Sequence, residues 1–575
     1  MKRMYFLLFI VVLILSGCDF IAPSSGSTTT EINTTKNSDT TTTISDVTST
    51  KEDISTTIEE ITTTENIPTT CKYHMDDNND NICDICGEYL GESTTTIKEC
   101  RFHMDDDNDG ICDVCFKNLI ERIDGTYFLT YKTINGYDSL NAKYLDYIVV
   151  SGETANWYEV SYAGLKRTEC SSKYESGVLT ITVGIKPYEF TYDNTNNTLS
   201  FDGTINKKNV VMTYTLTEES LEEDYNGIEF TNELFGESLD ENFYNYCPTI
   251  IMEGTNTMHI YYCTNEESGI VTDHIGYRKG TLHKNGTWSF SEKTIVLTPT
   301  PNTFDSAHVC DPSVIKGEFK YKGVSYTYLM AYLGVKKYDC TCNEVGLALS
   351  NSPSGPFIKY EGAFANYYES TDYGSDGGNF WGYGQPSLVS VDKKGQVLLF
   401  YTKGVKLGTF TYCEKWDLSN LDNPIKLNEG KLSDGGAIEI LNNADFAYDP
   451  INNRIYCIKE DHINGGYPTD GGVNWIAGSN TLYYTSLSKT DSFDSLFKQF
   501  TWASVGTINK SGTGFPRNHN AGILTDEYGW IISFDEVPVV YTKSDYATDY
   551  PDWNKGGQWP ALHTYRLHGF IISVS

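Results

Sequence analysis

The chain has 575 residues, of which 77 are acidic and 43 are basic, so its formal net charge at pH 7 is −34. A net charge of this sign repels phosphate backbones and argues against nucleic acid as a partner. The length exceeds what one hydrophobic core serves and predicts several domains. The 42 tyrosines and 49 glycines predict that these domains are of the all-β class.

The amino-terminal residues predict a lipoprotein signal peptide. Lys2 and Arg3 precede the apolar run 4–15, and Leu15-Ser16-Gly17 leads into Cys18. This pattern resembles the bacterial lipoprotein signal, in which the peptide is cut before a cysteine that receives lipid. A transmembrane helix is the alternative, but the run is shorter than the roughly 20 residues that a bilayer core needs. We expect residues 1–17 to be removed and Cys18 to anchor the protein in the membrane, on the extracellular face of the bacterial cell.

Residues 18–70 predict a disordered tether. They are mostly Ser, Thr, Asn, Ile and acidic residues. So few large apolar groups do not offset the entropy lost when a chain is ordered. We expect this segment to hold the rest of the protein away from the membrane.

Two copies of one short pattern follow, at 71–90 and 100–119. Each copy has the spacing C-x2-H-x8-C-x2-C, whose three thiolates and one imidazole suit tetrahedral zinc. These residues are Cys71, His74, Cys83 and Cys86, then Cys100, His103, Cys112 and Cys115. Disulfides are the alternative outside a cell, although three cysteines per copy leave one odd. We expect spacer or docking modules held by zinc or disulfides, not catalysts.

The same copies carry oxygen ligands at alternate positions. The pattern resembles the first part of an EF-hand or dockerin-type calcium loop, without the final bidentate Glu. The residues are Asp76, Asn78, Asp80 and Asp84, then Asp105, Asp107, Asp109 and Asp113. Calcium is therefore a second candidate cofactor beside zinc.

Residues 120–222 predict a small antiparallel β-barrel. Seven or eight short alternating or aromatic-rich segments, such as "VLTITVG", are separated by Gly, Asn and Asp turns. The opening "GTY" and the hairpin "YDNTNNTLSFDG" resemble bacterial lipocalin-like domains. Such a barrel either holds a small apolar ligand or is filled by its own side chains.

Residues 227–575 contain five copies of a longer theme, a polar residue, often a proline, an apolar strand, a turn and an aromatic strand. The copies begin near residues 247, 311, 385, 445 and 519, which lie 60 to 74 residues apart. This spacing predicts a five-bladed β-propeller with four strands in each blade. The predicted order is therefore tether, two metal-type repeats, barrel and propeller.

The "DPSVI" segment and the hairpin "EVGLALSNSPSGPFIKYEG" resemble those of five-bladed propeller glycoside hydrolases, the group of families 32, 43 and 68. The resemblance covers about 60% of the chain and implies that each of the first three blades delivers a carboxylate to a central funnel. Asp311 matches the orienting Asp of that pattern. Cys247 and Gln385 stand where carboxylates are expected, and Gln385 cannot donate a proton.

Other polar residues are expected at the same funnel. Asp445 and His519 begin the fourth and fifth copies and join Asp311 as catalytic candidates, because a histidine near its neutral pKa serves as acid or base. The candidates for substrate binding are His308, Trp381, Tyr383, Gln385, Arg517 and Asn518, with the two aromatic rings as a sugar-stacking platform. The alternative for each is a purely structural tie between strands.

Two function classes follow from these residues. The first is a cell-surface lipoprotein whose glycoside hydrolase-like propeller acts on or binds carbohydrate. The second is a non-catalytic glycan-binding or adhesion lipoprotein that uses the same funnel. The remaining cysteines, Cys263 and Cys310 among them, are expected to include a disulfide, a metal site or simply buried apolar groups.

Overall fold

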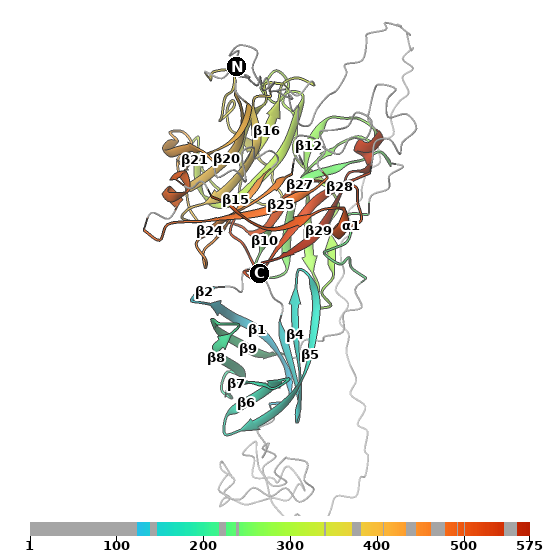
Figure 1. Ribbon diagram of the computed structural model, residues 1–575, viewed down its shortest axis with the longest axis vertical. Helices are drawn as coiled ribbons and strands as arrows, with labels where there is room; N and C mark the ends of the chain where they lie inside the picture. The colour runs from blue at the N-terminus through green and yellow to red at the C-terminus, as the bar shows by residue number, and fades with distance from the viewer. Residues whose placement is uncertain are drawn as a thin grey trace, which may run out of the picture. The chain divides into compact units, whose positions relative to one another are not determined.

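The computed structural model describes the chain from residue 123 onward, except for several stretches between strands (Figure 1). The predicted signal peptide, tether, Cys18 and both metal-type repeats lie outside the described residues. The described residues are 123–138, 146–217, 226–236, 241–338, 341–370, 381–405, 408–432, 444–461, 478–490, 493–498, 501–545 and 560–574.

Strands dominate the secondary structure, and the predicted all-β class is confirmed. The helical segments of the described chain are short: α1 (Lys510–Thr513), η4 (Phe493–Lys498) and η6 (Pro560–Thr564). Among the residues described, no helix has the length and apolar character needed to cross a bilayer.

Strands β1 to β9 form the closed antiparallel barrel that the sequence predicted. From β3 to β9 each strand pairs with the next, β1 closes the ring by pairing with β3 and β9, and β2 extends β1. Buried and partly buried positions alternate along β9, where Val210, Met212 and Tyr214 are buried. The strands are β1 (Gly125–Ile134), β2 (Tyr137–Asp138), β3 (Tyr147–Ser151), β4 (Thr154–Ser161), β5 (Gly164–Glu175), β6 (Val178–Val183), β7 (Lys186–Asp193), β8 (Thr198–Ile205) and β9 (Lys208–Thr217).

The C-terminal part consists of five consecutive groups of strands. The first group is β10 (Asn245–Glu253), β11 (Thr257–Asn265), β12 (Asp273–Leu282), β13 (Trp288–Phe290) and β14 (Thr294–Leu297). The second is β15 (His308–Tyr321), β16 (Val324–Val335), β17 (Glu344–Ser350) and β18 (Ile358–Lys359). The third is β19 (Tyr383–Ser390), β20 (Gln396–Val405), β21 (Gly408–Asp417) and β22 (Ile425–Lys431).

The fourth and fifth groups complete the chain. They are β23 (Asp445–Asp449), β24 (Arg454–Glu460), β25 (Asn480–Ser486) and β26 (Ala503–Ile508), then β27 (Arg517–Asp526), β28 (Glu536–Ser544) and β29 (Arg566–Ser573). Within each group successive strands pair antiparallel, except that β13 and β14 both pair with β12. β10 pairs parallel with β27, so the first and last groups share one sheet. The ends of the C-terminal part are thereby joined.

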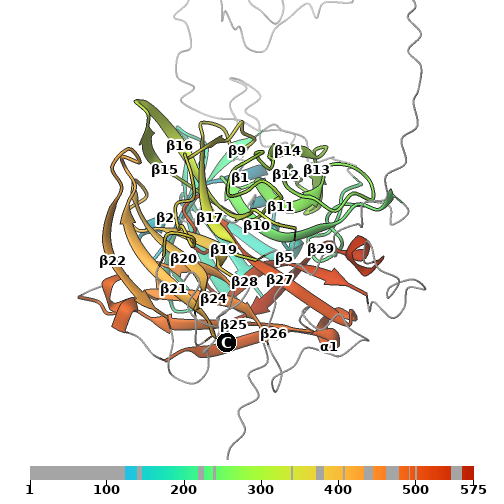
Figure 2. The same ribbon diagram turned by 90° about the horizontal axis from the view of Figure 1, so that it is seen from above.

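The first strand of each group lies on the inside. β10, β15, β19, β23 and β27 each contact the next in this order, and β27 contacts β10, so the five strands form a closed cycle. Figure 2 shows the five groups following one another around a shared centre, from green through yellow and orange to red. Each of these inner strands contains the start of one of the five repeats found in the sequence.

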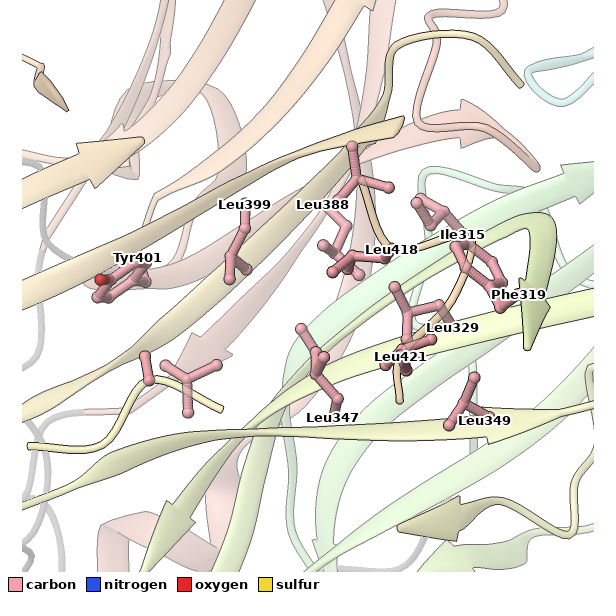
Figure 3. Close-up of a cluster of buried hydrophobic side chains, with 14 of the residues drawn as sticks. Ile315, Phe319, Leu329, Leu347, Leu349, Leu388, Leu399, Tyr401, Leu418 and Leu421 are labelled. Atoms are coloured by element: carbon pink, nitrogen blue, oxygen red, sulfur yellow. The ribbon is translucent and has the colours of Figure 1, made fainter. Parts of the chain in front are cut away.

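Apolar side chains fill the space between neighbouring groups. Figure 3 shows one such core, in which Leu329 and Leu347 of the second group pack with Leu388 and Leu399 of the third. Burial of a leucine side chain stabilises the fold by about 1.5–3 kcal/mol, so cores of this kind hold the inner strands in position. The barrel packs against the C-terminal strands in the same manner, and Trp288 Nε1 donates to Tyr162 O at 3.1 Å.

Candidate functional site

Four of the five inner strands share an unusual backbone feature. Cys247, Asp311, Gln385 and Asn520 have φ angles of 49°, 46°, 53° and 36°, the left-handed region that non-glycine residues rarely adopt. At each of these positions the register with the second strand of the group shifts, as at a β-bulge. A bulge re-aims a side chain, so all four strands turn the corresponding residue out of its ladder in the same way.

These residues line one small cavity. Its volume is about 40 Å³. All five inner strands contribute to its wall, which consists of Cys247, Pro248, Thr249, Asp311, Pro312, Gln385, Pro386, Ala444, Asp445, Asn520 and Ala521. The predicted site residues Asp311, Gln385 and Asp445 therefore meet at one point, although they are far apart in the sequence.

Asp311 is the carboxyl group among the four bulge residues. Burial raises its pKa to about 6, while the neighbouring thiol of Cys247 opposes this shift. Charges on His519 and Glu460 also act on the pKa of Asp311, in opposite directions. Glu460 lies beside the same site, because its side chain accepts a hydrogen bond from the backbone N–H of Asn520, which lines the cavity.

Two buried imidazole–carboxylate pairs, His519 with Glu460 and His308 with Asp273, involve residues of the inner strands β27 and β15. His519 Nδ1 contacts Glu460 Oε1, and that oxygen also accepts a hydrogen bond from Asn520 N at 3.0 Å. His308 Nδ1 accepts from Asp273 N at 3.0 Å, which places the proton of a neutral imidazole on Nε2. The Glu460–His519 contact therefore lies next to Asn520, which lines the cavity.

Glu460 is the site residue that sequence reasoning missed. It ends β24, the second strand of its group, and its side chain is fully buried. In the sequence it is one acidic residue after an apolar strand, "RIYCIKE", and the contact of β24 with β27 brings it to Asn520. An acidic residue at the end of the apolar strand that follows a repeat start is the signal that could have found it.

Asp445 and Asn518 make hydrogen bonds that join strands and loops. Asp445 Oδ1 accepts from Ser387 Oγ at 2.7 Å, and Oδ2 accepts from Ile523 N at 2.8 Å. Asn518 Nδ2 donates to Gly478 O at 2.9 Å, and its Oδ1 accepts from Thr513 Oγ1 at 2.9 Å. These contacts match the structural role that was the alternative for each residue.

The two aromatic residues expected to stack on sugar are buried. Trp381 and Tyr383 are 2% and 4% exposed, and the ring of Tyr383 makes edge contacts with Tyr367 and Tyr401. Neither ring presents a free face to a ligand in this structure. Gln385 lines the cavity, and Arg517 is fully buried at the start of β27.

Sulfur atoms gather beside Asp311. Cys263 and Cys310 form a disulfide, as the sequence left open, and Cys247 is a buried free thiol. One ligand atom each from Cys247, Cys263, Cys310 and Asp311 lie within 4.8 Å of one another, so the group could hold a metal ion. This cluster is separate in sequence from the predicted zinc and calcium repeats.

A second cavity lies at the barrel. Its volume is about 390 Å³, and barrel strands together with residues 532–536 line it. Lys132 Nζ and Asp146 Oδ2 face each other there at 3.5 Å, and burial raises the pKa of Asp146 to about 7. Charged and apolar side chains both line this cavity, and the expectation of either a small apolar ligand or a filled barrel stays a prediction.

No protein-family model matches the chain, and no curated protein resembles it in sequence. Among solved structures, the family 117 glycoside hydrolase Zg3597 of Zobellia galactanivorans is similar over 59% of this chain and 86% of its own, with 11% identity and a TM-score of 0.36. A thermostable family-43 glycoside hydrolase covers 60% and 93%, with 12% identity and a TM-score of 0.35. The α-L-arabinofuranosidase PaAbf62A of Podospora anserina covers 60% and 96%, with 13% identity and a TM-score of 0.35. Similarity at this level assigns no activity to the chain.

Proposed function

We propose that residues 227–575 form a five-bladed β-propeller whose axial site binds carbohydrate and cleaves a glycosidic bond. The observation that carries the proposal is the convergence of one residue from every inner strand on a single cavity. Polar groups that converge from separate strands are typical of a site that recognises a polar ligand. The five groups of strands would be the five blades, and the parallel pairing of β10 with β27 would close the ring.

Asp311 and the Glu460–His519 pair would supply the acid–base chemistry. Glycoside cleavage needs one group that protonates the leaving oxygen and a second that activates water or attacks the sugar. In this proposal Asp311 is the acid and Glu460, supported by His519, is the second group. Gln385 and Asn520 would read sugar hydroxyls through their amides.

A second candidate function is glycan binding without cleavage. It is favoured by Cys247 and Gln385, which occupy two of the three positions where the resembling enzymes carry carboxylates. A site that has lost two of three carboxyl groups keeps hydrogen-bonding capacity for hydroxyls but has less capacity for proton transfer.

A binding screen followed by product analysis separates the two. The full chain is tested on a glycan array, and the bound glycans are incubated with it and their products identified. Cleavage that Asp311→Asn and Glu460→Gln each reduce at least about 100-fold supports the hydrolase, since general acid–base groups contribute roughly 10²–10⁴-fold. Asp202→Asn, an exposed change on β8, is the matched control. Binding without products supports the second function, and the absence of both binding and products refutes both functions.

We also propose that the protein is held on the extracellular face of the membrane by lipid on Cys18. The apolar run after Lys2 and Arg3 and the small residues before Cys18 support this location. Metabolic labelling with a fatty acid should mark the wild-type chain and leave Cys18→Ser unlabelled. Equal labelling of the two chains would rule out this anchor.

A further inference from the structure

The sulfur cluster beside the axial cavity has the composition of a metal site. Cys247 comes from β10, Cys263 from β11, and Cys310 and Asp311 from β15, so three strands of two groups meet at this point. The four ligand atoms lie within 4.8 Å of one another. In a tetrahedral zinc site with Zn–S distances near 2.3 Å, ligand atoms are about 3.7 Å apart, so small side-chain movements would complete the geometry.

Neighbouring groups are arranged as those around metal-bound sulfur usually are. Asp311 N donates to Cys263 Sγ at 3.0 Å, and Asn520 Nδ2 contacts Cys247 Sγ. Hydrogen bonds from N–H groups orient metal ligands and stabilise their charged form. Asn520 is 8% exposed and lines the cavity, and its Oδ1 has no hydrogen-bond partner among the residues described.

The redox state of two cysteines decides whether the site exists. In the disulfide form, Cys263 and Cys310 are bonded to each other, which leaves Cys247 and Asp311 as ligands. A thiol or phosphine reductant would supply two electrons, the S–S bond would break, and two protons would complete the two thiols. Zinc would then displace three thiol protons and bind three thiolates and one carboxylate.

We propose that Cys247, Cys263, Cys310 and Asp311 form a zinc site that is available when the Cys263–Cys310 disulfide is reduced and is lost when the disulfide forms. The proposal does not depend on carbohydrate binding, because its readout is the metal itself. Zinc would bind the carboxylate of Asp311, which lines the axial cavity. Because zinc binds only when the disulfide is reduced, the state of this cavity would depend on the redox state of the surroundings.

Cadmium, a thiophilic probe for such sites, tests the proposal on the full chain. The chain is reduced with a phosphine, freed of it without air, and loaded with cadmium in the presence of a competing chelator. The predicted N-terminal repeats carry candidate ligands of their own, so matched chains are compared. We expect the reduced wild type to bind one cadmium more than Cys247→Ala and to show a stronger sulfur-to-cadmium absorption band. Cys170→Ala, a change of another buried free cysteine, should match the wild type.

The disulfide form provides the second comparison. Without reductant, the wild type and Cys247→Ala should bind equal amounts of cadmium, because two of the four ligands are absent from both. Equal binding by the two reduced chains overturns the proposal, and so does an extra cadmium in the unreduced wild type.

A measurement on the wild type alone covers the case in which Cys247→Ala does not fold. The reduced chain is alkylated with and without zinc, and each cysteine is quantified by peptide mass spectrometry. Zinc should slow alkylation of Cys247, Cys263 and Cys310 at least about tenfold and leave Cys170 unchanged. Loss of the supporting amide in Asn520→Gly, which keeps the left-handed backbone, should weaken zinc affinity about 10- to 100-fold. Unchanged alkylation of all three cysteines in the presence of zinc overturns the proposal.

Discussion

Asp445 links three inner strands, and we predict that it acts as a structural tie. Its two carboxylate oxygens accept from Ser387 Oγ of β19 and from Ile523 N of β27, at 2.7 and 2.8 Å. Ser387 Oγ in turn accepts from Phe446 N at 3.0 Å. Both oxygens are thus committed to neighbouring strands, and Asp445→Asn should weaken the fold more than it affects any chemistry.

The magnitude follows from these contacts. A hydrogen bond to an ionised group contributes about 1.5–3 kcal/mol, and Asn offers one acceptor oxygen where Asp offers two. Since the amide N–H group would then face a donor, the free energy of unfolding should fall by about 2–4 kcal/mol. Burial raises the pKa of Asp445 to about 6, so the measurement belongs near pH 8, where the carboxylate is charged.

The assay is urea or thermal unfolding of the full chain, followed by tryptophan fluorescence. Ser387→Ala removes one partner of Asp445, so the double variant should lose less than the sum of the two, by about 1–2 kcal/mol. The exposed control Asp202→Asn should change stability by less than about 0.5 kcal/mol. If Asp445→Asn unfolds like the wild type while carbohydrate turnover disappears, the residue belongs to the chemistry and this reasoning is refuted.

Three further predictions concern other parts of the chain. Burial raises the pKa of Asp146 from 3.8 to about 7 despite the nearby Lys132, so its contribution to stability is full below about pH 4 and is lost as the pH rises to about 7. Asp146→Asn should therefore reduce the change in unfolding free energy between these pH values by up to about 4 kcal/mol. Equal pH profiles of stability for the wild type and the variant would contradict this prediction. A Cβ at Gly522 would lie 2.1 Å from Pro248 O, so Gly522→Ala should lower the free energy of unfolding by about 2 kcal/mol or more through a clash at the β10–β27 pairing. An unchanged melting temperature would show that the backbone at this pairing moves to accommodate the methyl group. Leu399→Ala should cost about 2–5 kcal/mol in urea unfolding, because its buried site lies between two packed groups of strands, and a loss under about 1 kcal/mol would show that the core collapses into the space.

The strand pattern could be predicted because local chemistry determines much of it. The barrel was expected over 120–222 and its strands run from Gly125 to Thr217, since alternating side chains and Asn or Gly turns specify each hairpin. The five repeat starts likewise fall in the five inner strands, because each begins with a polar residue before an apolar strand. Closure of the ring through the parallel β10–β27 pair involves residues over 250 positions apart, and no local pattern encodes it.

The site could be predicted only in part. Asp311 and Gln385 were placed at one centre because equivalent positions of repeats occupy equivalent places in space. Glu460 was missed because its place depends on the contact of β24 with β27, whose residue Asn520 is 60 positions away in the sequence, and no local pattern encodes that contact. The Cys263–Cys310 disulfide joins residues 47 positions apart, and sequence alone does not give cysteine connectivity.

The repeated left-handed backbone is the strongest sign that the centre is a functional site. A non-glycine residue in this region costs on the order of 1 kcal/mol, so Cys247, Asp311, Gln385 and Asn520 together hold roughly 4 kcal/mol of strain. That is a sizeable fraction of the 5–15 kcal/mol that typically stabilises a protein. Glycine at each position would relieve the strain and would also remove the side chain from the cavity wall. These four inner-strand residues all face one cavity and none is glycine, so their side chains remain in its wall despite the strain, which supports the proposed binding site.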